Sequence, residues 1–252
     1  GIAGILNQTA GYILFPYVYK DSDAHAQLGI FGAASKIAMI MSMITQAFRY
    51  AYEPFVFGKS RDKDNKETYA RAMKFFLIFT ILAFLVVMGY MDVLRHIIGR
   101  DYWVGLRVVP IVMAGGIMTG VYFNLSFWYK LIDKTIWGAY FSGIGCAVII
   151  GINVIFVPHY GYMACAWAGF LGNATAMVLS YVVGQRKYPI DYPLKSILVY
   201  VLIGGFFFAI ITYCNANLSV PEALGVNTLV IIAFIAHVIY HDMPQVIRKF
   251  KK

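Results

Sequence analysis

Residues 26–57 read AQLGIFGAASKIAMIMSMITQAFRYAYEPFVF. This run is long and apolar enough to cross a bilayer, since about 20 apolar residues span the hydrocarbon core. It nevertheless carries Lys36, Gln46, Arg49 and Glu53. A charged side chain at the centre of a spanning helix costs roughly 2.5–3.5 kcal/mol on insertion scales, so it normally faces a bundle interior or a wet cavity. We therefore expect this helix to line a cationic cavity.

Lys36 lies ten residues after Ala26, which puts it about 15 Å into the helix and near the midplane of the bilayer. At this depth we expect its ammonium group to face a cavity for an anionic substrate; the alternative is that it extends to the interface or pairs with another helix. Arg49 and Glu53 are four residues apart and are expected to pair near the other interface. Lys36 and Arg49 project about 140° apart on an ideal helix. The two side chains can face one cavity only if the helix bends. We therefore expect Lys36, rather than Arg49, to be the main cation of the cavity.

The composition indicates a polytopic membrane protein. The chain is 60% hydrophobic and only 13% charged, and its mean hydropathy is +0.68. Soluble domains usually carry about 25% charged residues. The three cysteines, Cys146, Cys165 and Cys214, lie in or beside apolar segments without the spacing of a metal site. We expect them to be small buried hydrophobic residues.

Eight apolar segments are expected to form transmembrane helices, at residues 1–19, 26–57, 73–91, 108–129, 136–157, 162–184, 194–213 and 223–240. Residues 58–71 are charged and are predicted to form a partly helical connection on the membrane surface. The fifth and sixth segments are rich in glycine, and small residues let helix backbones approach closely in lipid. The last two segments carry no embedded charge apart from His237.

The basic residues are distributed unevenly between the two sides of the membrane. When the connections are assigned to alternate sides, fifteen of the 21 lysines and arginines fall on one side and four on the other. The positive-inside rule places the basic side in the cytoplasm, so both ends of this chain are expected there. The net charge of +9 is therefore a signal of topology and of attraction to anionic lipids, not of a nucleic-acid partner.

No catalytic constellation is recognisable. The five histidines are scattered among loops and helix ends, and no glycine-rich phosphate loop is present. We predict no enzyme activity, no metal site and no cofactor.

Asp92 and Arg95 are expected to form a solvated pair at the membrane interface. Among the embedded amides, Asn7 and Asn124 could equally line a passage or hydrogen-bond between helices.

Two longer stretches carry a family resemblance. Residues 99–135, GRDYWVGLRVVPIVMAGGIMTGVYFNLSFWYKLIDKT, and residues 157–173, VPHYGYMACAWAGFLGN, resemble polysaccharide biosynthesis flippases, the Wzx-type branch of the MOP superfamily. The shorter pieces GIAGILNQ, AQLGIFGAASKIAMIM and QAFRYAYEPFVF resemble the same family of capsule and O-antigen exporters. No single motif is diagnostic, and the resemblance rests on the order and spacing of all of them.

The resemblance implies a MATE-like architecture of 12 to 14 helices in two pseudo-symmetric lobes. Residues 1–193 would be the six-helix C-terminal lobe, and residues 194–252 two additional transmembrane helices with a basic cytoplasmic tail. The first residue is glycine, and we expect the chain to be the C-terminal part of a longer protein whose N-terminal lobe is missing. The implied function is the flipping of undecaprenyl-diphosphate-linked oligosaccharide across the bacterial inner membrane by alternating access.

The resemblance and the embedded polar groups together give the candidate substrate-binding residues Lys36, Arg49, Glu53, Gln46, Asn7 and Asn124. Lys36 would contact the diphosphate or acidic sugars, because a cation attracts an anion more strongly in a low-dielectric cavity than in water. Arg49, restrained by Glu53, would guard the cytoplasmic mouth. The expected partners are the lipid-linked oligosaccharide, membrane lipids, the missing N-terminal lobe and glycan polymerase machinery.

Three other functions stay open. A MATE-type multidrug exporter coupled to sodium or protons would need acidic residues deep in the bundle, whereas the charge in the middle of the second span is basic. A lipid II flippase carries a substrate with the same diphosphate carrier. A membrane enzyme of glycan assembly is disfavoured by the short external loops and the absence of catalytic acids.

Overall fold

The computed structural model describes residues 11–19, 23–58 and 65–242, and all of the regular structure in these ranges is helical. Residues 11–18 form a helix. The other long helices are α2 (Ala24–Gly58), α3 (Asn65–Gly89), α5 (Val109–Leu125), α7 (Ile136–Tyr160), α8 (Tyr162–Lys187), α9 (Leu194–Asn217) and α10 (Val220–Asp242). The short helices are α4 (Met91–Leu94), η1 (Arg95–Ile97), η2 (Arg100–Val108) and α6 (Phe127–Leu131). The prediction of an all-α protein is confirmed.

Seven segments of the described residues are long and apolar enough to cross a membrane. They correspond to α2, α3, the continuous stretch from η2 to α6, α7, α8, α9 and α10. These are seven of the eight predicted spans, and the protein is a multi-pass membrane protein. Most of the first predicted span, including the candidate residue Asn7, lies outside the described residues.

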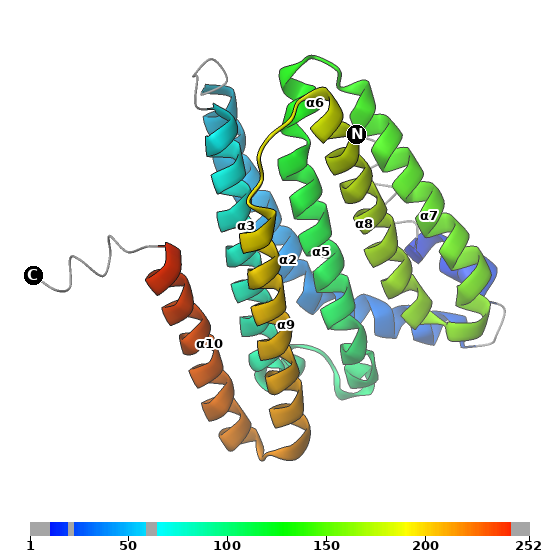
Figure 1. Ribbon diagram of the computed structural model, residues 1–252. Coiled ribbons are helices and arrows are strands. Elements are labelled where there is room, and N and C mark those ends of the chain that lie inside the picture. Colours follow the sequence, from blue (N-terminus) through cyan, green and yellow to red (C-terminus); the bar gives the residue numbers. More distant parts are fainter. Residues whose placement is uncertain (1–10, 20–22, 59–64, 243–252) are drawn as a thin grey trace, which may run out of the picture.

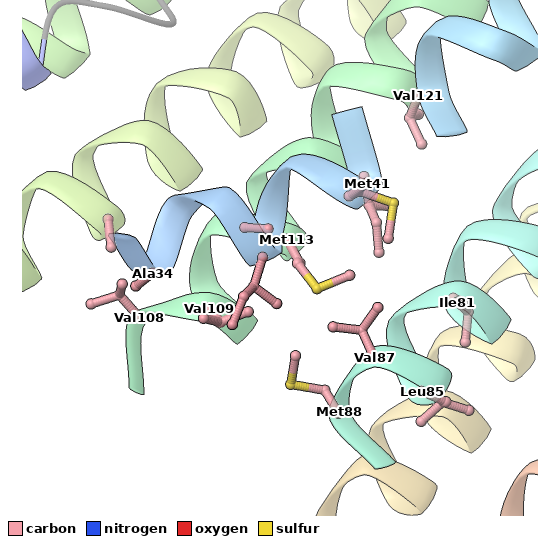
Figure 2. Close-up of a cluster of buried hydrophobic side chains, with 14 of the residues drawn as sticks. Ala34, Met41, Ile81, Leu85, Val87, Met88, Val108, Val109, Met113 and Val121 are labelled. Atoms are coloured by element: carbon pink, nitrogen blue, oxygen red, sulfur yellow. The ribbon is translucent and has the colours of Figure 1, made fainter. Parts of the chain in front are cut away.

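Successive long helices run in opposite directions (Figure 1). α7 packs against α8, α8 against α5, and α5 against α2, which crosses the bundle obliquely. α3 contacts α5 and α2 and carries α9 and α10 on its other side. Figure 2 shows the apolar contact between α2, α3 and α5, where Met41, Met113 and Leu85 are fully buried.

The start of α3, the connection between α5 and α7, and the end of α8 lie at one end of the bundle, the upper end in Figure 1, which we call the basic end. The described lysines and arginines in or next to the segments at this basic end are Lys66, Arg71, Lys74, Lys130, Lys134, Arg186, Lys187 and Lys195. The connections at the opposite end hold Arg95, Arg100 and Arg107. The alternation of helices thus reproduces the predicted asymmetry, and α2 runs toward the basic end.

One predicted connection is partly wrong. Residues 65–71 are not a separate surface segment, because they form the first two turns of α3. Their polar side chains stabilise that helical end, where Arg71 forms an exposed ion pair with Glu67 at 2.7 Å. This spacing of four residues places both side chains on one helix face.

Glycines permit the closest helix contacts, as the sequence predicts. A Cβ atom on Gly145 of α7 would lie 2.9 Å from the carbonyl oxygen of Gly172 in α8, and one on Gly172 would lie 2.8 Å from that of Gly145. No larger side chain fits between two backbones at this distance. Gly161 is the single residue between α7 and α8. Its backbone angle φ is +54°, a conformation that glycine adopts without strain.

The connection from α3 to α5 is held against α2. Asp92 and Arg95 form the predicted ion pair at 2.9 Å, and the guanidinium carbon of Arg95 lies 4.5 Å from the Trp103 ring centroid. A Cβ on Gly105 of η2 would lie 2.8 Å from the carbonyl oxygen of Ile30. Glycine is therefore required where η2 meets α2.

Polar contacts fix α9 and α10 to α3 at the end away from the basic end. The side-chain amide of Asn227 donates to the Gly89 carbonyl at 2.9 Å and to Asn215 Oδ1 at 2.8 Å. The amide of Asn215 donates to the Met88 carbonyl at 3.3 Å. These bonds satisfy carbonyl groups at the end of α3 that have no partner within the helix.

At the basic end, Lys74 of α3 forms an ion pair with Asp242 of α10, which also accepts a hydrogen bond from the Tyr200 hydroxyl of α9. The contact joins the three helices at that end. It is not predicted from the sequence, because the expected last span ends at residue 240. The division of the chain into a lobe and an added helix pair stays a prediction.

Candidate functional site

A hollow of about 280 Å³ lies between α2, α5 and α8. Its wall is made by residues 11 and 12, by residues 31–46 of α2, by residues 112–123 of α5, and by residues 165–173 of α8, with one contact from α7. Gly169 widens it, because no atom lies within 4 Å of the place where a Cβ would stand. The hollow follows the helix face on which α2 carries its small and hydroxylated residues.

The lining of this hollow is mostly apolar, includes several hydroxyl and amide groups, and carries no formal charge among the described residues that form it. Hydroxyl and amide groups come from Ser42, Thr45, Gln46, Thr119 and Asn173. The Thr45 hydroxyl and Gln46 Oε1 are enclosed and have no hydrogen-bond partner among the described residues. Enclosed groups of this kind normally find a partner. Apart from these two enclosed atoms, the hydroxyl and amide groups of the lining can form hydrogen bonds with a ligand or water in the hollow.

Aromatic rings border the hollow at several points. Tyr12, Phe31, Phe123 and Phe170 belong to its lining, and Tyr12 lies 5.1 Å from Phe31 between ring centroids. Flat apolar rings next to hydroxyl and amide groups form a mixed surface, which suits a ligand with both apolar faces and polar edges.

Lys36 does not line this hollow. Its side chain is exposed, on the same side of α2 as Met43, which is 64% exposed, and Tyr50, which is 68% exposed. Within this chain the described residues leave that face of α2 uncovered. The prediction that Lys36 is the first cation of the cavity therefore finds no support in the hollow.

Arg49 lies at the end of the hollow that is nearer the basic end. On an ideal helix it projects within about 60° of Ser35, Ser42 and Gln46, which all line the hollow. Lys36 projects about 140° away from it. Of the two cations, Arg49 is therefore the one that projects toward this hollow, and a role in substrate binding stays a prediction for both.

The guanidinium group of Arg49 lies near two aromatic rings. Its carbon lies 5.0 Å from the ring centroid of Phe123 and 5.3 Å from that of Tyr50. Thr45 and Phe123 line both the hollow and a smaller space of about 10 Å³ that Arg49 borders. Its Nε is enclosed and has no hydrogen-bond partner among the described residues. Within that part of the chain, the guanidinium group is therefore positioned without a carboxylate.

Glu53 has a different partner from the one predicted. Its carboxylate accepts a hydrogen bond from Lys130 Nζ at 2.6 Å. Lys130 belongs to α6, so this ion pair joins two segments that are distant in the sequence. The predicted Arg49–Glu53 pair does not form among the described residues, because the tertiary partner competes successfully for the carboxylate.

Two predicted amides lie near Arg49 with different surroundings. Gln46 lines the hollow. Asn124 is buried beside Arg49, where its amide donates to the Gly120 carbonyl at 3.0 Å and its Oδ1 has no partner within the described residues. This hydrogen bond lies within α5 and does not join two helices, so both interpretations of Asn124 stay predictions.

Three residues of this region, Thr45, Asn173 and Lys130, are not predicted as site residues from the sequence. The available signal for Thr45 is its place one residue before Gln46 on the most polar face of α2. Asn173 stands among small residues that suggest packing alone, yet it lies in the wall of the hollow. Nothing in the sequence alone indicates that Lys130 meets α2. No group of three metal-binding side chains occurs among the described residues.

Comparison with known proteins identifies the fold. No protein-family profile and no curated protein sequence matches the chain. Among solved structures, the chain is similar to lipid II flippase MurJ in an inward closed conformation, with a TM-score of 0.71 and 16% sequence identity. The match covers 95% of this chain and 52% of that structure, so the chain spans about half the length of the solved protein.

The structure is therefore that of a polytopic membrane protein whose fold is like that of a solved flippase. The particular protein that it resembles is MurJ, and at this level of identity the likeness concerns the fold.

Proposed function

We propose that this chain is one half of a flippase that moves a polyprenyl-diphosphate-linked oligosaccharide from the cytoplasmic to the outer leaflet of the bacterial inner membrane. The fold likeness to a lipid II flippase supports this function. Alternating access between this half and a second one would expose the hollow to each side of the membrane in turn.

The observation that carries the proposal is the position of Arg49. Its guanidinium group, which has no carboxylate partner in the described part of the chain, stands at the end of an uncharged, hydroxyl-lined hollow. Arginine binds phosphate oxygens through two parallel hydrogen bonds, and the attraction is strong in a site with little water. We assign the diphosphate to Arg49 and the adjoining sugar to the hollow with Gln46.

The other candidate residues take different parts in this proposal. Asn124 supports the Arg49 end, while Asn7 stays a candidate from the sequence alone. Lys36 acts outside the hollow, on a part of the pathway that other segments of the protein complete. Glu53 is not kept among the ligands, because its carboxylate is bound to Lys130 and would repel a diphosphate.

The proposal includes an orientation and a set of partners. The basic end faces the cytoplasm, as the positive-inside rule requires, so Arg49 stands toward the side where the substrate is loaded. Residues 1–193 act as a lobe, residues 194–252 as an added helix pair, and the rest of the protein supplies the opposite lobe. Membrane lipids surround the helices, and contact with glycan polymerase machinery stays a prediction.

Two substrates are compatible with the proposed assignment of a diphosphate to Arg49. The resemblance in sequence favours capsule or O-antigen oligosaccharide, whereas the fold likeness favours lipid II, which the solved protein is described as flipping. Both are joined to the membrane by the same diphosphate carrier. The site chemistry at Arg49 is common to them, so the glycan must be identified by experiment.

Depletion of the full-length protein in its own cell tests the proposed function. We expect lipid-linked glycan to accumulate on the cytoplasmic leaflet, and mass spectrometry of that lipid identifies the sugars. Loss of surface polysaccharide indicates the first substrate, and loss of peptidoglycan synthesis the second. Drug retention without any accumulation of lipid-linked glycan would instead indicate a multidrug exporter.

A further inference from the structure

We propose that Lys130 is a positioning residue for anion binding: by holding the carboxylate of Glu53, it keeps Arg49 available to an anionic ligand. This inference rests on the proposed function, because it takes the diphosphate as the ligand of Arg49. Lys130 itself is not assigned a contact with the substrate.

Glu53 stands where two cations compete for it. It follows Arg49 by four residues on α2, the spacing at which an arginine and a glutamate commonly pair on a helix. In the structure its Oε1 is instead 2.6 Å from Lys130 Nζ. The side chains of Lys130 and Glu53 are 29% and 32% exposed, so water screens their attraction less than it would a fully exposed pair.

The position of Lys130 is fixed by its neighbours in α6. Phe127, Trp128 and Tyr129 precede it and are 4%, 2% and 6% exposed. Trp128 donates through Nε1 to the Ser180 hydroxyl of α8 at 3.4 Å. Because these rings anchor α6 in the bundle, the ammonium group of Lys130 is presented to α2 rather than to open solvent.

The consequence concerns the charge available beside the hollow. If Glu53 were released, its carboxylate could reach Arg49 on the next turn of the same helix and neutralise it. A phosphate ligand would then compete with an internal anion for the guanidinium group. With Glu53 bound to Lys130, Arg49 instead keeps its position against Phe123 and Tyr50 and retains its charge for the ligand.

The test measures the binding of farnesyl diphosphate to the purified full-length protein and variants of it. We expect K130A to weaken binding about tenfold, because the freed carboxylate competes with the ligand. K130R should bind like the parent protein, since arginine also holds Glu53. E53Q should bind within about twofold of the parent, and the double variant K130A/E53Q should regain that affinity because no carboxylate is left to compete.

The affinities of these variants distinguish a positioning role of Lys130 from direct contact with the diphosphate and from a purely structural role. If Lys130 touches the diphosphate, K130A/E53Q stays as weak as K130A, and the proposal is wrong. If the ion pair only stabilises the fold, E53Q and K130A lower the thermal stability equally and impair binding equally, which also overturns it. A K130A variant that binds like the parent contradicts the proposal directly.

The R49Q variant distinguishes this inference from the proposed function. If R49Q loses binding while K130A retains it, the role of Lys130 is wrong and the assignment of the diphosphate stands. If R49Q binds farnesyl diphosphate like the parent, the proposed site itself is wrong. In an R49Q background, K130A should cause no further loss, since Glu53 then has no guanidinium group to neutralise.

Discussion

Helix α2 carries two cations that project in different directions. Lys36 projects from an exposed face together with Met43, whereas Arg49 lies near the rings of Phe123 and Tyr50 at the end of the hollow. The depth of the side chain in the membrane favours Lys36 as the substrate-binding cation, whereas the direction in which the side chain projects favours Arg49. We therefore base the proposed assignment of the diphosphate on the direction in which each side chain projects, not on its depth in the membrane.

The largest effect is expected from R49Q. In the proposed site, replacing the guanidinium group removes charge-assisted hydrogen bonds to the diphosphate. These are worth about 1.5–3 kcal/mol, which corresponds to a loss of about 10- to 100-fold in affinity. Export of lipid-linked glycan in cells should fall accordingly while the membrane level of the protein is unchanged. R49K is the control: a single ammonium group cannot bind bidentately, so its loss should be intermediate. Normal export by R49Q would remove Arg49 from the site.

A smaller effect is expected when the hollow is filled. Gly169→Leu places a side chain where no atom lies within 4 Å of the position that the Cβ would occupy, so the fold should tolerate it while the sugar loses its space. We expect export to fall by about tenfold, the equivalent of about 1.4 kcal/mol. Met43→Phe adds bulk on the Lys36 face and serves as the matched control. Equal losses in both variants would show that the hollow is not the binding surface.

The smallest effect is expected from K36Q. Because Lys36 lies outside the hollow, its neutralisation should lower export by no more than about threefold, or less than about 1 kcal/mol. The measurement is the amount of surface glycan relative to the protein level in the membrane. A loss as large as that of R49Q would return Lys36 to the centre of the cavity.

The membrane architecture could be predicted from the sequence with little loss. Runs of apolar residues place the helices because backbone groups in lipid must be satisfied within each span, and the basic residues divide between the ends as expected. The error at residues 65–71 has a local reason. A charged segment such as 65–71 can continue a helix beyond the membrane, and composition alone does not separate that from a surface connection.

The site could be predicted only in part, because it depends on contacts between distant segments. Gln46 and Arg49 could be selected from their place in an apolar run. The sequence could not show which face of α2 meets α5 and α8, since both faces carry apolar residues. Nor could it show that Lys130, 77 positions away, takes Glu53 from its helical neighbour. Local spacing predicts a pair only where no tertiary partner competes.

The most direct test compares R49Q and K36Q side by side by the dissociation constant of the full-length protein for farnesyl diphosphate. We expect R49Q to raise this constant about 10- to 100-fold while K36Q changes it by less than about threefold. The opposite order, with binding lost in K36Q and retained in R49Q, would contradict the assignment of the diphosphate to the hollow.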